Sequence, residues 1–110
     1  MRMPFQIDLT GKVVLITGVS SGIGLGTARE FARAGACVAG CSRKPGTDDS
    51  VSVFLQAVER EGRKALYVQA DVTQEKELEQ FVQEVITTFG RLDIVVSNAG
   101  IYNRLLLNIL

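Results

Sequence analysis

Three glycines within seven residues, in the segment 18–24, constrain what this chain can fold into more than any other feature. The segment follows the apolar run Val13-Val14-Leu15-Ile16, which is typical of a buried parallel strand. It leads into residues 23–34, which have helical periodicity. The positions that carry this periodicity are Ile23, Thr27, Phe31 and Ala34. The sequence therefore predicts a strand, a glycine-rich turn and a helix, in that order.

This arrangement is typical of an anion site, most often one for the phosphates of a nucleotide. Free N–H groups and the positive dipole end at the helix start attract a pyrophosphate, and glycines let the backbone approach it. Gly18, Gly22 and Gly24 give the spacing G-x-x-x-G-x-G, and no G-K-[ST] follows, which excludes a P-loop. The alternative is that three glycines form only a tight loop, but the flanking strand and helix lie where a phosphate site requires them.

Residues 17–24, TGVSSGIG, resemble the coenzyme fingerprint TGxxxGxG of the short-chain dehydrogenase/reductase family, and Thr10-Gly11-Lys12 resembles the family's lead-in to the first strand. The resemblance implies a Rossmann-type domain that binds NAD or NADP. It also implies hydride transfer to or from carbonyls and alcohols. The coenzyme contacts that it implies in this segment are Gly18, Ser20, Ser21, Gly22, Ile23 and Gly24.

The rest of the chain alternates strands and helices without a linker. We expect strands at 13–17, 37–41, 65–70 and 93–97, and helices at 23–34, from about 51 to 62, and from Thr73 to Gly90. Four strands separated by helices imply a parallel sheet with right-handed crossovers. We expect the order 3-2-1-4, part of a doubly wound α/β fold. Residues 1–102 are assigned to the N-terminal half of an NAD(P)-binding domain, and 103–110 to an atypical C-terminal tail.

The residues just past the second strand bear on the choice of coenzyme. An acidic side chain there would hydrogen-bond the adenosine ribose and favour NAD, but this strand ends in Ser42-Arg43-Lys44, without an acid. By the resemblance, Ser42 takes the place of the NAD-selecting aspartate, and Arg43 follows where many NADP-using members have arginine. Because a guanidinium can hold a 2′-phosphate with two hydrogen bonds, we expect NADP, with NAD as the less favoured coenzyme. The alternative is that Arg43 and Lys44 are solvated loop charges.

Two further segments extend the resemblance along the chain. Asp71-Val72 lies where the family holds adenine, so the Asp71 carboxylate would accept from the adenine amino group and the Val72 backbone would pair with the ring. Alternatively, Asp71 helps cap the next helix, in competition with Thr73, and both roles can hold. Asn98-Ala99-Gly100 matches the family's Asn-Ala-Gly motif. The resemblance implies that this segment stabilises the sheet and lets the ribose and nicotinamide approach the backbone closely.

The resemblance also implies catalytic residues that this sequence does not match. The family uses a tyrosine with a lysine four residues later, together with a serine and an asparagine, all downstream of the Asn98 segment. Tyr67 and Tyr102 have Asp71 and Leu106 at the lysine position, so no catalytic residue is carried over. Two functions stay open: the NADP(H)-binding part of an oxidoreductase, or a catalytically inactive nucleotide-binding fragment or interaction module.

Composition excludes several other classes of function. Twelve Lys and Arg balance twelve Asp and Glu, so there is no overall attraction to nucleic acid or to an anionic membrane. No stretch approaches the roughly twenty apolar residues of a membrane span, and the start lacks an apolar signal core. We expect a cytoplasmic protein whose partner is a small carbonyl or alcohol substrate, and the family resemblance implies homo-oligomers at full length.

The cysteines do not indicate a disulfide or a metal site. Cys37 and Cys41 fall in one expected strand, where their Cα atoms would be about 13 Å apart, at roughly 3.3 Å per residue. A disulfide requires less than about 7 Å. The sequence contains no histidine, which excludes a Cys/His metal site. We expect both cysteines to be inert, partly buried thiols.

Overall fold

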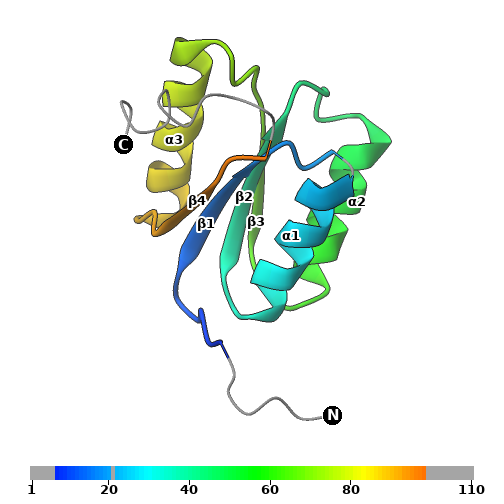
Figure 1. The fold of residues 1–110 in the computed structure, drawn as a ribbon, viewed down its shortest axis with the longest axis vertical. Coiled ribbons are helices and arrows are strands. Elements are labelled where there is room, and N and C mark those ends of the chain that lie inside the picture. The colour runs from blue at the N-terminus through cyan, green and yellow to red at the C-terminus, as the bar shows by residue number, and fades with distance from the viewer. Residues whose placement is uncertain (1–6, 21, 99–110) are drawn as a thin grey trace.

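The structure is a computed structural model that describes residues 7–20 and 22–98. Four parallel strands form one sheet in the order β3-β2-β1-β4, which confirms the expected α/β architecture (Figure 1). The elements, in chain order, are β1 (Val13–Thr17), α1 (Gly22–Arg33), β2 (Cys37–Ser42), α2 (Asp49–Glu59), β3 (Ala65–Gln69), α3 (Glu75–Phe89) and β4 (Ile94–Val96). The tail assigned to 103–110 lies outside the described residues. None of the helices in the described part is long and apolar enough to cross a membrane.

Helices cover both faces of the sheet, with α1 and α2 on one face and α3 on the other (Figure 1). Successive residues of a strand point to opposite faces, so Val14 and Ile16 of β1 pack toward α1 and α2, while Val13 and Leu15 pack toward α3. All five residues of β1 are buried. This two-sided burial is why the strand reads as a continuous apolar run rather than an alternating one.

The buried face of α1 differs from the predicted one. The expected stripe began at Ile23, but the Ile23 side chain is 78% exposed, whereas Gly24, Ala28 and Ala32 are buried. Phe31 still packs at the margin of that core. Gly24 has no side chain, and Ala28 and Ala32 have only a methyl group, which lets the helix lie close to the sheet. Small size rather than hydrophobicity therefore selects the inward face.

The ends of α2 and α3 differ from the expected ones. Asp48 caps α2, because its carboxylate accepts the Ser50 N–H at 3.0 Å. Helix α2 ends at Glu59 rather than at Gly62, since Gly62 N–H donates to the Glu59 carbonyl in a tighter turn. The prediction that Thr73 caps α3 is wrong. The N-cap is Gln74, which makes no side-chain capping bond.

Strand β4 is only three residues long, and side chains hold it to β1 at both ends. At one end, the Asp93 carboxylate accepts the Val13 N–H at 2.9 Å and two hydrogen bonds from Arg91 at 2.9 and 2.8 Å. At the other end, the Asn98 N–H donates to Thr17 Oγ1 at 2.8 Å. The Arg91 hydrogen bonds, followed by the Val13 N–H, hold the pKa of Asp93 below its ordinary value. A charged carboxylate therefore supports the β1–β4 register, together with the backbone bond from the Asp93 N–H to the Val13 carbonyl at 3.0 Å.

This lowered pKa predicts an acid-dependent loss of stability. Because the folded-state pKa of Asp93 is depressed, its contribution to the unfolding free energy is present above the unfolded-state pKa and is lost as pH falls through the folded value. We expect Asp93→Asn to lower the urea midpoint at pH 7 and to flatten its decline between about pH 5 and 2. Glu79→Gln, an exposed substitution on α3, is the control. Parallel midpoint-versus-pH curves for wild type and Asp93→Asn would contradict this role.

Candidate functional site

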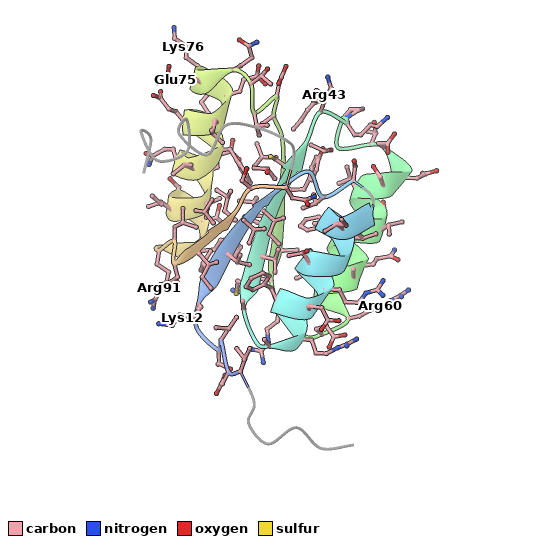
Figure 2. All side chains as sticks on the ribbon, in the orientation of Figure 1. Lys12, Arg43, Arg60, Glu75, Lys76 and Arg91 are labelled. Atoms are coloured by element: carbon pink, nitrogen blue, oxygen red, sulfur yellow. The ribbon has the colours of Figure 1, made fainter. Side chains whose placement is uncertain are left out.

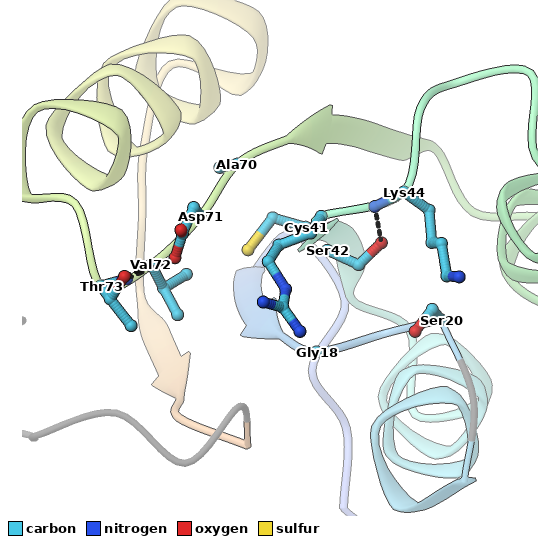
Figure 3. Close-up of a pocket in the computed structure, with 10 residues that line it drawn as sticks. Gly18, Ser20, Cys41, Ser42, Lys44, Ala70, Asp71, Val72 and Thr73 are labelled. Atoms are coloured by element: carbon cyan, nitrogen blue, oxygen red, sulfur yellow. Dashed lines mark hydrogen bonds between the residues drawn. The ribbon is translucent and has the colours of Figure 1, made fainter.

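A pocket of about 390 Å³ lies at the carboxyl edge of the sheet, where β1, β2 and β3 end (Figure 3). Parallel strands direct their carboxyl ends to the same edge, so residues far apart in sequence meet there. The lining residues are Gly18, Ser20, Cys41, Ser42, Arg43, Lys44, Ala70, Asp71, Val72 and Thr73. Among residues 7–20 and 22–98, no three His, Cys, Asp or Glu side chains gather in a possible metal site.

Half of the predicted site residues line this pocket. The predicted residues found in the lining are Gly18, Ser20, Ser42, Arg43, Lys44, Asp71 and Val72. The described residues that are not in the lining are Gly22, Ile23, Gly24 and Asn98, of which Gly24 and Asn98 contact the lining residue Gly18. Ser21, Ala99 and Gly100 lie outside the described residues. The lining residues that were not predicted are Cys41, Ala70 and Thr73, and each directly precedes or follows a predicted residue. The coenzyme-binding roles of all these residues stay predictions.

Hydrogen bonds fix the glycine-rich turn against two neighbouring strands. The N–H groups of Gly18 and Val19 donate to the Cys41 carbonyl at 2.9 and 3.1 Å, and Asn98 Nδ2 donates to the Gly18 carbonyl at 3.2 Å. Gly24 packs directly on this turn. A Cβ atom at Gly24 would lie 1.9 Å from the Gly18 carbonyl oxygen and 2.6 Å from Asn98 Nδ2. Only glycine allows the start of α1 to approach the end of β1 this closely.

Gly22, the first residue of α1, is a glycine for a different reason. Its φ is +61°, a conformation that other residues adopt only with strain, but an added Cβ would meet no protein atom within 4 Å. The space beside it is therefore open. The first N–H groups of a helix have no partners within the helix, and the first turn of α1 carries no acidic residue. This helix end is suited to an anion.

Two cations, Arg43 and Lys44, follow β2 in the wall of the pocket. Arg43 lies at the carboxyl edge of the sheet in Figure 2, and both Arg43 and Lys44 are exposed. The ion pairs found in the described part of the chain join Arg33 to Glu30 and Arg91 to Asp93. Neither Arg43 nor Lys44 takes part in them, so both charges remain available to a ligand.

Asp71 accepts two hydrogen bonds in the turn before α3, and its predicted contact with adenine stays a prediction. Its Oδ1 accepts the Thr73 N–H at 3.0 Å and the Thr73 hydroxyl at 2.6 Å, which shapes the turn before α3. These bonds hold the pKa of Asp71 below its ordinary value, and the positive charge of Arg43 lowers it further. A charged carboxylate therefore lines the pocket beside Val72, which is buried.

Cys41 lines the pocket but is not suited to nucleophilic chemistry. Burial raises the pKa of its thiol to about 12, so the thiolate is scarcely populated at neutral pH. Cys41 and Cys37 are both free, and they lie at opposite ends of β2.

A parallel sheet in this order, with a glycine-rich turn after the first strand and a pocket at the carboxyl edge, defines a Rossmann-type nucleotide-binding domain. Residues 12–108 match the family of short chain dehydrogenases, and the chain belongs to that family. The resemblance drawn from TGVSSGIG is thus confirmed. Members of this family use a nicotinamide coenzyme, NAD or NADP.

Individual relatives agree with this membership. A hydroxynaphthalene reductase of Aspergillus fumigatus is 47% identical over 97 residues, which cover 86% of this chain and 34% of that protein. A crystal structure of a short-chain type dehydrogenase/reductase from Mycobacterium marinum has a TM-score of 0.79 at 40% identity and covers 86% of this chain and 37% of that one. An NADH-dependent reductase complexed with NAD has a TM-score of 0.75 at 35% identity, over 84% and 37% of the two chains. The chain spans about a third of the length of these relatives.

The close packing at Gly24 predicts a large effect of one methyl group. Gly24→Ala drives a Cβ into the Gly18 carbonyl, and we expect it to lower the unfolding free energy by about 1–3 kcal/mol, as overpacking does. Gly26→Ala is the matched control, because it lies in the same helix with open space around its Cβ position. That variant should gain about 0.5–1 kcal/mol from reduced chain entropy. Urea unfolding of both variants measures the difference, and equal stabilities would contradict the packing argument.

Proposed function

We propose that this chain is the NADP(H)-binding part of a short-chain dehydrogenase/reductase that transfers hydride between NADP(H) and a carbonyl or alcohol substrate. The observation that carries the coenzyme choice is the wall of the pocket after β2, where Arg43 and Lys44 follow Ser42 and no carboxylate does. A carboxylate at that position would repel a 2′-phosphate, whereas a guanidinium can bind it with two hydrogen bonds. Because the chain covers about a third of its relatives, the hydride transfer is proposed for the whole protein.

The residues present fit a dinucleotide. The pocket volume of about 390 Å³ falls within the usual range for small-ligand sites. The open side of Gly22, at the start of α1, suits a pyrophosphate. We assign the pyrophosphate contacts to Ser20, Ile23 and the neighbouring glycines, together with Ser21, which lies outside the described residues. We assign adenine to Asp71 and Val72, and the 2′-phosphate to Arg43 and Lys44.

We assign the binding of the nicotinamide side of the coenzyme to the segment that follows β4. Asn98 already ties this segment to the Gly18 carbonyl, which places residue 98 next to the glycine-rich turn. We assign the close approach of the ribose and nicotinamide to Asn98, Ala99 and Gly100, of which the last two lie outside the described residues. When bound, the coenzyme supplies the hydride, and the residues of this chain bind and orient it.

A second function has one observation in its favour. These 110 residues contain no Tyr-x-x-x-Lys, so a nucleotide-binding module without turnover is the competing proposal. Both proposals require coenzyme binding, and neither expects turnover by these 110 residues alone. They differ in whether a longer protein carries the catalytic residues, so sequencing the gene past codon 110 separates them: a downstream Tyr-x-x-x-Lys would support the oxidoreductase, and its absence would support the binding module.

The coenzyme preference is tested by direct titration. We expect NADPH to bind the wild-type chain more tightly than NADH by roughly one to two decades, the contribution of one charged hydrogen-bonded contact. Arg43→Ala should remove most of this preference by weakening NADPH binding alone. Arg60→Ala, at the far end of α2, is the matched control and should leave both dissociation constants unchanged (Figure 2). Equal wild-type affinities for the two coenzymes would refute the NADP assignment.

The pyrophosphate assignment is tested at Gly22. Gly22→Val introduces a side chain into open space beside the helix start, and we expect it to abolish binding of both NADPH and NADH. Gly62→Val is the matched control, because Gly62 also has a positive φ, +77°, and open space around it, but lies away from the pocket. Both variants therefore bear similar backbone strain. If Gly22→Val folds with native helix content and retains coenzyme affinity, the glycine-rich segment is only a turn.

A further inference from the structure

Three consecutive carbonyls, beginning with that of Ser42 at the end of β2, all accept hydrogen bonds from β3 or the residue next to it. The Ser42 carbonyl accepts the Ala70 N–H at 2.9 Å, which continues the sheet. The next two carbonyls are held by side chains instead. Gln69 Nε2 donates to the Arg43 carbonyl at 3.1 Å, and the Tyr67 hydroxyl donates to the Lys44 carbonyl at 2.5 Å. The backbone that carries both cations is therefore tied to β3 beyond the end of the sheet ladder.

The Tyr67 hydroxyl also determines what Ser42 can do. The two hydroxyl oxygens are 2.6 Å apart, and the single proton of Tyr67 is directed to backbone carbonyls. The Ser42 hydroxyl therefore donates its own proton to Tyr67 and accepts the Lys44 N–H at 3.2 Å (Figure 3). Because that proton is used within the protein, Ser42 has none left to donate to a coenzyme. Its side chain belongs to the network that holds residues 43 and 44.

The ring of Tyr67 is anchored by packing in the hydrophobic core. It packs against Phe54, which is fully buried, with the ring centroids 6.3 Å apart and the planes tilted by 59°. Tyr67 and Gln69 are two residues apart in β3 and so point to the same side of the strand. Burial raises the pKa of the Tyr67 phenol, so it stays protonated at neutral pH and acts as a donor.

We propose that Tyr67 and Gln69 are positioning residues that hold Arg43 and Lys44 at the pocket wall and thereby set the discrimination between a 2′-phosphate and a 2′-hydroxyl. This inference rests on the proposed binding of NADP(H) by this pocket. Long, exposed cationic side chains lose conformational freedom when they bind a phosphate. If the backbone of residues 43 and 44 were also mobile, binding would have to order it as well. A backbone that is already fixed removes this part of the entropy cost of binding.

The test compares binding of NADPH and NADH to the 110-residue chain and to its variants. Tyr67→Phe keeps the ring contact with Phe54 and removes only the hydroxyl. Gln69→Ala removes the second tie from an exposed position, where the fold is not at risk. Each variant should weaken NADPH binding about three- to tenfold, because part of the cost of ordering the backbone of one residue then falls on the binding step, while NADH binding stays unchanged. Gln56→Ala, on the exposed side of α2, is the control and should change neither affinity.

Two further measurements separate positioning from a general structural effect. In the Arg43→Ala background, Tyr67→Phe should have a smaller effect on NADPH binding. Tyr67 is proposed to act by positioning the Arg43 contact with the 2′-phosphate, and that contact is already absent in this background. Amide hydrogen exchange of the ligand-free chain should speed up at Lys44 in Tyr67→Phe, since the Ser42 hydroxyl loses its partner. This second readout does not depend on the coenzyme.

The outcomes distinguish this inference from the proposed function. If the wild type prefers NADPH and Arg43→Ala abolishes the preference, but Tyr67→Phe and Gln69→Ala retain it in full, the positioning role is wrong and the proposed function stands. Equal weakening of NADPH and NADH binding by both variants would also overturn the positioning role. If wild type shows no preference for NADPH, the NADP assignment fails and the inference fails with it.

Discussion

The close contact between the start of α1 and the end of β1 is the constraint on which the rest of the site depends. Gly24 lies so near the Gly18 carbonyl that no side chain fits between them, and Asn98 from the end of β4 closes the same junction. Three segments thus meet at one point of the sheet's carboxyl edge. This contact turns the helix start, with its unpartnered N–H groups, toward the space beside Gly22.

Charges of opposite sign occupy different parts of the pocket that this junction borders. Arg43 and Lys44 follow β2, whereas Asp71 follows β3 and is held by Thr73 in a turn that keeps it ionised. A ligand that presents a phosphate toward the end of β2 and hydrogen-bond donors toward the end of β3 matches this arrangement. The separation follows from topology, because neighbouring parallel strands deliver their next residues side by side at one edge.

Tyr67 shows how a core residue can shape a polar site. Its ring contributes to the hydrophobic layer under α2, and its hydroxyl reaches the segment after β2. One end of the side chain is thereby anchored by packing, while the other organises hydrogen bonds at the surface. A phenylalanine at position 67 would fill the same space, but it has no hydroxyl to donate to the Ser42 and Lys44 carbonyls.

The sequence by itself determined the order of elements, the parallel sheet and the glycine-rich turn, because two-sided burial makes apolar runs and glycine spacing reflects backbone geometry. It also identified most of the pocket, since the residues that follow parallel strands share one edge. It did not predict the inward face of α1, where Gly24 and not Ile23 is buried, because close packing there selects small size over hydrophobicity. Nor did it predict the bonds from Tyr67 to Ser42 and Lys44, which join residues 25 and 23 positions apart. Only the tertiary structure decides such contacts, because they depend on the register in which β2 and β3 pair.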